Sequence, residues 1–296
     1  MEVYAEYFGG FSRSKQKMKK PINLPGDLFG VNCQKAYIEA MSQEEPAQPP
    51  PEEILPGVEV SPQPDNLPVL TQNSNLNLAD YIILECRQYS NGYFYPDLLV
   101  AKHLTLYNHN WYQSHEKLQQ NNQFMLTIRQ FVDFVNLLKS GTAYDGQKKQ
   151  ISSQELNQIQ DEILTQRSPG RVEWLDADFK YLGNNKQEVA SNQLGNLWLY
   201  SQHRLINGKI EPQYKQHLEN CLTKNCYADL FDSANNQGLP TTKTTSGLYY
   251  HSPMKENKSV ARFWARSSRV NFNCGGNMQD SLFALRVRAA QQYVLK

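Results

Sequence analysis

The sequence lacks the features that place a protein in a membrane or send it through a secretory pathway. No run of about 18 apolar residues occurs, so we expect no membrane-spanning helix. At the N-terminus the basic run from Arg13 to Lys20 follows the aromatic residues, and no apolar core with a small-residue cleavage site is present. This order is not that of a secretory signal. We therefore expect a water-soluble protein. The sequence leaves its location open: it could be associated with a virion or be displayed on a surface by another route.

An excess of charge of one sign is also missing. The 30 basic and 29 acidic residues leave a net charge of +1, so no overall field favours nucleic acid or an anionic membrane as a partner. The chain has only five cysteines, an odd number spread over 296 residues. That pattern is unlike the dense, even set of a secreted domain held by disulfides. We therefore expect reduced cysteines, no nucleic-acid partner and no insertion into a membrane.

Common metal-binding and cofactor-binding motifs are absent as well. Cys221 and Cys226 in CLTKNC do not have the spacing of a zinc ribbon or a redox pair. The glycine-containing segments match neither a P-loop nor a dinucleotide fingerprint. The histidines are scattered: His103, His109, His115, His203, His217 and His251. Spacing alone predicts no metal and no cofactor, although a fold can bring distant histidines together.

One acidic cluster stands out in the segment VEWLDADF, where Glu173, Asp176 and Asp178 lie close together. Such carboxylates can supply a general acid and base or bind calcium. More often, a loop of this kind carries capping and turn carboxylates beside a buried tryptophan, which here is Trp174. No nucleophile elbow surrounds Ser246 in TTSGLYY. We therefore expect no catalytic site.

The composition divides the chain into two parts. Residues 46–68 hold eight of the 15 prolines, a density that favours extended conformers and removes backbone donors. Before this segment, residues 1–45 form a polar arm whose basic run we interpret as solvated. The sequence therefore predicts an N-terminal arm and proline-rich linker over residues 1–77, followed by a domain over residues 78–296.

Two helices are predicted within the domain. The segment MLTIRQFVDFVNLLKSG places Thr127 as N-cap and Gly141 beyond the last turn. The segment ISSQELNQIQDEILTQ places Ser152 and Glu155 at capping-box spacing. Apolar residues recur at helical spacing in both: Ile128, Phe131, Val135 and Leu138 in the first, and Leu156, Ile159 and Ile163 in the second. We expect each helix to bury one side.

The rest of the domain indicates strands. The segment LADYIILECRQYSNGYFYPDLLVA reads as a strand, a turn and a second ordered segment. From Val172 onward, short aromatic-rich runs alternate with Gly, Asn and Pro, which favours short strands and long loops. We therefore expect an α+β fold in which the two helices pack beside a small antiparallel sheet.

Four segments near the C-terminus occur in a fixed order: EWLDADF, GNLWLYSQHRLING, GLPTTKTTSGLYYHSP and SVARFWARSSRVNFNCGGNMQDSLFALRVRAA. In this order they resemble the variable proteins of diversity-generating retroelements and are close to an archaeal viral member. The resemblance implies a C-type lectin fold of the subtype shared with formylglycine-generating enzymes. It covers residues 78–296, and the helix after Thr127 looks like the first helix of that fold.

The resemblance also explains why small, aromatic, amide and charged residues are mixed within residues 259–290. In this family a reverse transcriptase miscopies adenines of a template repeat, and the copies replace a variable region near the C-terminal end of the gene. Asn codons of the form AAC then yield many residue types but never Lys or Glu. From Trp264 to Arg286 the sequence has neither Lys nor Glu.

The positions that look variable are the candidates for ligand contact. They are Trp264, Arg266, Ser268, Asn271, Phe272, Asn273, Gly275, Gly276, Asn277, Asp280, Leu282 and Ala284. Trp264 requires a Lys-type template codon instead of an Asn codon. An ordinary irregular loop is the alternative interpretation of the same residues.

The flanking segments VARF and VRAA look like an invariant frame. We expect Phe263 and Val287 in the core, and Arg288 tying the region down through its several N–H donors. The variable positions are expected to be exposed. Replacing Trp264 or Phe272 by Asn should then barely change the melting temperature.

Two functions follow as hypotheses. The first is a monomeric binding module, in which a rigid scaffold presents adaptable contact residues to an unidentified target, a protein or another cell-surface ligand. It needs no cofactor, no metal and no catalysis. The alternative is an oxidase of the formylglycine-generating type. Those enzymes place two copper-binding cysteines before the final segment, where this chain has only Cys274.

Overall fold

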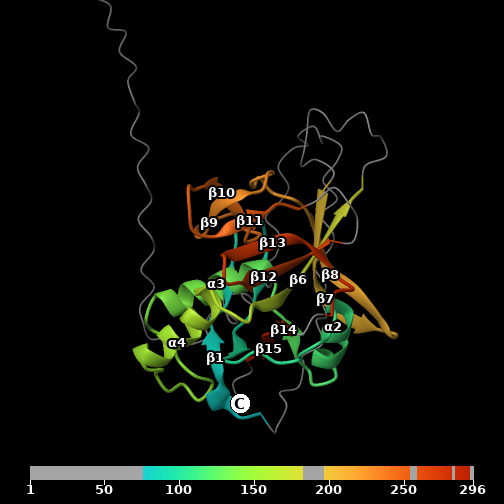
Figure 1. Ribbon diagram of the computed structural model, residues 1–296. Coiled ribbons are helices and arrows are strands. Elements are labelled where there is room, and N and C mark those ends of the chain that lie inside the picture. The colour runs from blue at the N-terminus through green and yellow to red at the C-terminus, as the bar shows by residue number, and fades with distance from the viewer. Residues whose placement is uncertain (1–75, 183–196, 254–258, 282–283, 294–296) are drawn as a thin grey trace, which may run out of the picture.

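The computed structural model describes residues 76–182, 197–253, 259–281 and 284–293. Residues 1–75 of the expected arm and linker over residues 1–77, and the candidate contact residue Leu282, lie outside these residues. The described chain contains helices and a larger share of strand (Figure 1). The expected α+β class is therefore confirmed at this level.

A four-stranded antiparallel sheet joins the two ends of the described chain. Its strands, in spatial order, are β1 (Tyr81–Leu84), β4 (Leu98–Ala101), β15 (Ala289–Gln292) and β5 (Phe124–Met125). The short 3-10 helix η1 (Leu78–Asp80) precedes β1, and a hairpin of β2 (Arg87–Gln88) and β3 (Phe94–Tyr95) lies between β1 and β4. The strand, turn and second ordered segment expected here are confirmed.

Three α-helices occur in the described residues: α2 (Trp111–Gln119), α3 (Ile128–Lys139) and α4 (Ser153–Leu164). Both predicted helices, α3 and α4, are confirmed with their N-caps, Thr127 and Ser152. Helix α4 buries one side, as expected. Helix α3 is buried on nearly every side because it contacts α4, β1, β6 and β9, so the expectation of a single buried side is wrong for α3.

A second sheet contains nine strands. Eight lie in the order β10 (Pro240–Lys243), β9 (Cys226–Ala234), β11 (Tyr249–His251), β13 (Val270–Asn277), β12 (Ser259–Ala265), β6 (Arg171–Tyr181), β7 (Leu197–Ile206) and β8 (Lys209–His217), and β14 (Leu285–Val287) pairs with β6. Strands β11 and β13 are parallel, as are β14 and β6, whereas the other neighbours are antiparallel. The expected small antiparallel sheet is therefore wrong in size and in strand length.

Strand β6 carries the acidic cluster that was expected in a loop. Its carboxylates, those of Glu173, Asp176 and Asp178, are all buried. Glu173 Oε1 accepts a hydrogen bond from Arg288 Nε at 3.1 Å, and Asp176 Oδ1 lies 2.5 Å from His203 Nδ1. Because basic partners compensate the buried carboxylates, the segment is stable as an inner strand, and the loop interpretation is wrong.

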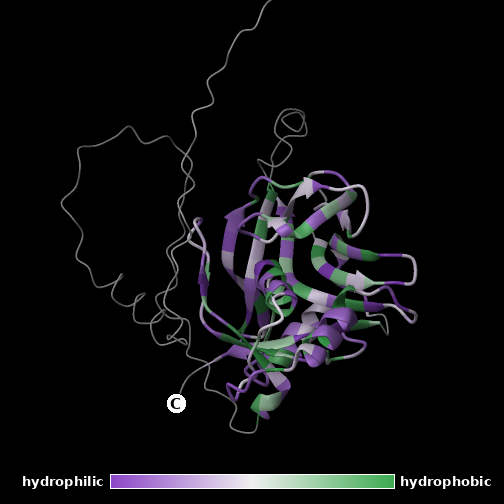
Figure 2. Ribbon diagram, turned by 90° about the vertical axis from the view of Figure 1, so that its left-hand side faces the viewer, coloured by the Kyte–Doolittle hydropathy of each residue, from purple (hydrophilic) through white to green (hydrophobic). Residues whose placement is uncertain are grey.

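The hydrophobic core forms two clusters, and alternating residues of the larger sheet contribute to each. Phe263 belongs to the first cluster, where its ring centroid lies 5.0 Å from that of Phe131 on α3. Trp174 and Val287 belong to the second. Figure 2 shows the resulting bands of hydrophobic and hydrophilic residues along the strands. The core positions expected for Phe263, Trp174 and Val287 are confirmed.

Arg288 links the C-terminal segment to both sheets. Its side chain is 1% exposed. Besides the bond to Glu173 on β6, Nη1 donates to the backbone carbonyl oxygens of Ala101 at 2.8 Å and Lys102 at 2.6 Å, at the end of β4. The guanidinium carbon lies 5.3 Å from the centroid of the Phe134 ring. The expected anchoring role of Arg288 is therefore confirmed.

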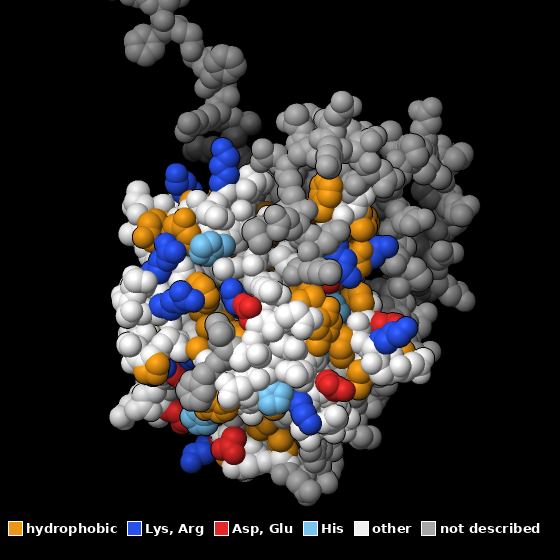
Figure 3. Space-filling view, turned by 45° about the vertical axis from the view of Figure 1, so that its right-hand side comes forward, with side chains coloured by type: hydrophobic (Ala, Val, Ile, Leu, Met, Phe, Trp, Pro, Cys, Tyr) orange, Lys and Arg blue, Asp and Glu red, His pale blue; other side chains and the backbone are white. Residues whose placement is uncertain are grey.

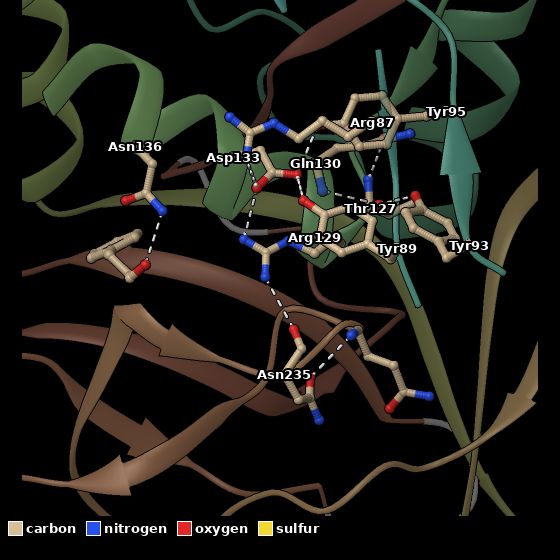
Figure 4. A network of polar contacts seen from close by, with 12 residues as sticks. Arg87, Tyr89, Tyr93, Tyr95, Thr127, Arg129, Gln130, Asp133, Asn136 and Asn235 are labelled. Carbon is tan, nitrogen blue, oxygen red and sulfur yellow. Dashed lines mark hydrogen bonds and ion pairs between the residues drawn. The ribbon is translucent and has the colours of Figure 1, made fainter. Parts of the chain in front are cut away.

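A second buried charge, Asp133 on α3, fixes the β2–β3 hairpin to the helix (Figure 4). The carboxylate accepts hydrogen bonds from the hydroxyls of Tyr89 and Tyr95 and from Arg129 Nη2, the last two at 2.7 and 2.8 Å. Arg129 Nη1 donates in turn to the carbonyl oxygen of Asn235, beyond β9, at 3.0 Å. The network explains why Arg129 and Asp133 are buried, since both join α3 to a neighbouring element, whereas the buried Gln130 side chain accepts a hydrogen bond from the N-cap Thr127.

Candidate ligand-binding face

Strand register places the candidate contact residues in rows across the larger sheet. Paired residues have their side chains on the same face. Trp264 pairs with Asn271, Asn271 with Tyr249, and Tyr249 with Tyr227. These four residues therefore form a cross-strand row over β12, β13, β11 and β9, on the face opposite Phe263.

A second row lies beside the first, where Arg262 pairs with Asn273 and Asn273 pairs with His251. Arg262 lies over two tryptophan rings, 4.8 Å from the centroid of Trp264 and 5.7 Å from that of Trp174. Its Nη1 donates to Asp280 Oδ2 at 2.7 Å. The two rows and their flanking loops form what we call the outer face.

Arginine side chains stack on the aromatic rings of the outer face. The guanidinium carbon of Arg266 lies 3.6 Å from the centroid of Trp264, and that of Arg269 lies 4.2 Å from the centroid of Tyr249. Each contact combines cation–π attraction with apolar contact. Tyr249 also meets Tyr227 edge to face at 5.2 Å. The aromatic side chains are thus held in defined positions.

The outer face has an excess of positive charge. Arg262 is paired with Asp280, but within the described residues neither Arg266 nor Arg269 has a carboxylate partner. Figure 3 shows basic side chains beside hydrophobic ones in the upper part of the visible surface, with acidic ones mainly lower down. A surface of this kind favours a partner that carries carboxylates.

Two buried polar atoms of the outer face have no hydrogen-bond partner among the described residues. They are Arg262 Nε and Trp264 Nε1. A buried polar group without a partner costs roughly 1 to 3 kcal/mol. Hydrogen bonds from a ligand or from ordered water would remove that cost.

Seven of the candidate positions have side chains or backbone at the surface. Arg266, Ser268 and Asn277 are exposed, and Trp264, Gly275, Asp280 and Ala284 are half-buried. The segment is not an irregular loop, because β12 and β13 pair over most of its length. The turn with Arg266 and Ser268 leaves the strand conformation, as do the described residues after β13, where Asp280 and Ala284 lie.

Four candidate positions are buried, and for these the expectation of exposure is wrong: Asn271, Phe272, Asn273 and Gly276. Phe272 points into the core and stacks on Tyr250, with ring centroids 5.8 Å apart. Gly276 has no room for a side chain, since an added Cβ would lie 2.7 Å from the carbonyl oxygen of Val260. Asn271 and Asn273 lie on the outer face but are covered by their neighbours.

Two buried thiols belong to the inner side of the same region. Burial raises the pKa of Cys221 to about 11 and holds that of Cys274 well above its usual range, and Tyr250 lies against both. The thiols are therefore protonated at neutral pH. In the sequence Cys221 lies near Cys226 instead, and no local signal indicates the approach of Cys221 to Cys274.

The structure also brings together three residues that are far apart in the sequence: His115 on α2, Asp176 on β6 and His203 on β7. All three are buried, and one possible ligand atom from each lies within 4.8 Å of the others. Burial lowers the pKa of His115 to about 3, so its imidazole is neutral. Histidine spacing gave no indication of this cluster.

Comparison with protein-family models, curated proteins and solved structures finds no match to this chain. Among the described residues, no helix is both long enough and apolar enough to cross a membrane.

Phe272 and Trp264 provide a direct test of the two sides of the hairpin. Phe272→Asn should destabilise the protein by about 3 to 5 kcal/mol because it removes a buried ring. Trp264→Asn should cost less, about 1 to 2 kcal/mol, because the ring is partly exposed and contacts Arg262 and Arg266, although it also packs against the second core cluster. Urea unfolding measures both values, with Ser268→Ala as the control. Equal losses for the two Asn variants would show that both rings are core residues.

Proposed function

We propose that the protein is a ligand-binding module that contacts its target with the outer face of β12 and β13. The observation that supports this most directly is the separation of roles within one hairpin. Phe263 and Phe272 pack in the core, whereas Trp264 and Arg266 lie on the opposite side. Residues of the outer face can therefore change with little effect on the residues that hold the fold.

The chemistry of the outer face suits a protein surface. Stacked arginine and aromatic side chains resemble the contact residues that dominate protein–protein binding energy. Arg266 and Arg269, which have no carboxylate partner among the described residues, favour a target with an acidic patch. The target is a protein or another cell-surface ligand, and the binding module is a monomer without a cofactor.

We also propose that the protein is a variable protein of a diversity-generating retroelement, with a C-type lectin fold of the formylglycine-generating subtype. The support is the order of its four C-terminal sequence segments, which resembles an archaeal viral member of that family. The α+β class is compatible with this fold. We exclude Gly276 and Phe272 from the proposed variable positions. A side chain at Gly276 would clash with the backbone of Val260, and replacement of Phe272 would disturb the core.

The oxidase alternative is less well supported. An oxidase of the formylglycine-generating type requires two convergent thiolates to bind copper. Cys221 and Cys274 approach the same tyrosine, but burial raises the pKa of both thiols and keeps them protonated at neutral pH. Cys221 and Cys274 therefore fit a role in packing the core better than a role in binding copper.

Binding is tested with two matched libraries of the displayed full chain. One randomises four outer positions: Trp264, Arg266, Ser268 and Asp280. The control randomises the same number of inner positions around Phe263 and Phe272. Selection against a panel of immobilised proteins should yield specific binders from the outer library alone, because inner variants lose the fold. Failure of the outer library, despite normal display, would contradict the proposed function.

The retroelement origin is tested by the flanking DNA. We expect a near-repeat of the segment that encodes residues 259–290, differing at adenines, beside a gene for a reverse transcriptase. Differences spread over all four bases would argue against adenine-directed variation.

A further inference from the structure

The buried cluster of His115, Asp176 and His203 is covered by α2 and shares no residue with the outer face. His115 comes from the middle of α2, Asp176 from the middle of β6 and His203 from β7. The rings of both histidines pack against Trp111, with centroids at 4.2 and 4.8 Å. The cluster therefore joins α2 to the larger sheet.

His115 has no hydrogen-bond partner in the described structure. Its side chain is 0% exposed, and both Nδ1 and Nε2 are buried without a hydrogen bond. Nε2 points toward Asp176 Oδ1, 3.6 Å away, which is too long for a hydrogen bond. A fully buried imidazole with both nitrogens unpaired indicates a missing ligand, since buried polar groups are almost always satisfied by a partner, a water or an ion.

The separation of these two atoms matches co-ligation of a metal. Ligand atoms at about 2.1 Å from a tetrahedral ion lie about 3.4 Å from one another. His203 Nδ1 is closer to Asp176 Oδ1, at 2.5 Å. In that contact a proton occupies the place that an ion would take, and the His203 ring must move by about 1 Å as the metal replaces the proton.

The backbone is arranged to aim His203 at the cluster. Pairing of β7 with β6 ends at Tyr200 and Asp178. Gln202, directly before His203, has a left-handed φ of 55°. The backbone N–H of His203 then donates to Asp176 Oδ2 at 2.9 Å, where a strand partner would otherwise accept it. A strained, non-glycine residue next to a convergent polar cluster is typical of a constrained site.

We infer that His115, Asp176 and His203 bind a structural divalent transition-metal ion, with zinc as the best match. Two imidazoles and one carboxylate suit zinc, and a site closed to solvent favours a structural role. The ion would clamp α2 to β6 and β7.

Cobalt titration of the full chain tests the inference. The protein is purified without a histidine tag, freed of metal with a chelator and titrated with Co²⁺. We expect saturation at one ion per chain with the strong visible bands of a four- or five-coordinate site, displaced by Zn²⁺. Weak bands typical of six-coordinate Co²⁺, or no saturable binding, would overturn the inference.

Matched histidine variants assign the ligands. His115→Gln should weaken Co²⁺ binding by about a hundredfold or more, since even changes next to metal ligands cost 10- to 100-fold. His217→Gln, an exposed histidine stacked on Trp198, should bind as the parent protein does. If His115→Gln does not fold, the melting temperature of the parent protein is compared with and without Zn²⁺. A structural ion must raise this melting temperature, because it binds the folded state. An unchanged melting temperature would contradict the site.

Discussion

Strand alternation in β12 and β13 is the constraint on which the rest of this structure depends. Successive side chains point to opposite faces of a sheet, so each residue of the hairpin is committed to one of two environments. Phe263 and Phe272 are held in a core that includes α3, while Trp264 and Arg262 lie on the other side. A surface that varies and a frame that does not can therefore occupy the same short segment of chain.

The frame is held by buried charges as well as by apolar packing. Arg288 joins β6 to the end of β4, and Asp133 joins α3 to the β2–β3 hairpin. Removing one partner of such a pair would leave an uncompensated charge in the core, which costs about 3 to 5 kcal/mol. These contacts connect segments that are distant in sequence. Elements from the N-terminal half of the domain, α3 and β4, therefore help to hold the frame around the β12–β13 hairpin.

The sequence predicted the elements whose signals are local. Caps at Thr127 and Ser152 and apolar spacing identified α3 and α4. Helix α2 was missed because its buried stripe includes Ser114 and His115, which weakens the hydrophobic period. Strand β6 was taken for a loop because its buried carboxylates find basic partners only in the folded chain.

The sequence predicted only part of the candidate site. Trp264, Arg266 and Ser268 do lie at the surface. The codon pattern expected for variable positions, however, gives no information on the direction in which a side chain points. Phe272 was assigned to the surface although the alternation with Asn271 and Asn273 places it inside. The grouping of His115 with Asp176 and His203 has no local signal, since it arises only when α2 packs on β6 and β7.

A substitution scan over residues 259–277, read out by protease resistance of the displayed chain, tests the central claim most directly. We predict a period of two in β12 and in β13 from Val270 to Cys274, before the register shift that precedes Gly276. Tolerance should be low at inward positions such as Phe263 and Cys274, higher at outward positions such as Trp264, and broad in the turn at Ser268. A uniform profile, or one in which Trp264 is less tolerant than Phe263, would contradict the division of the hairpin into frame and binding face.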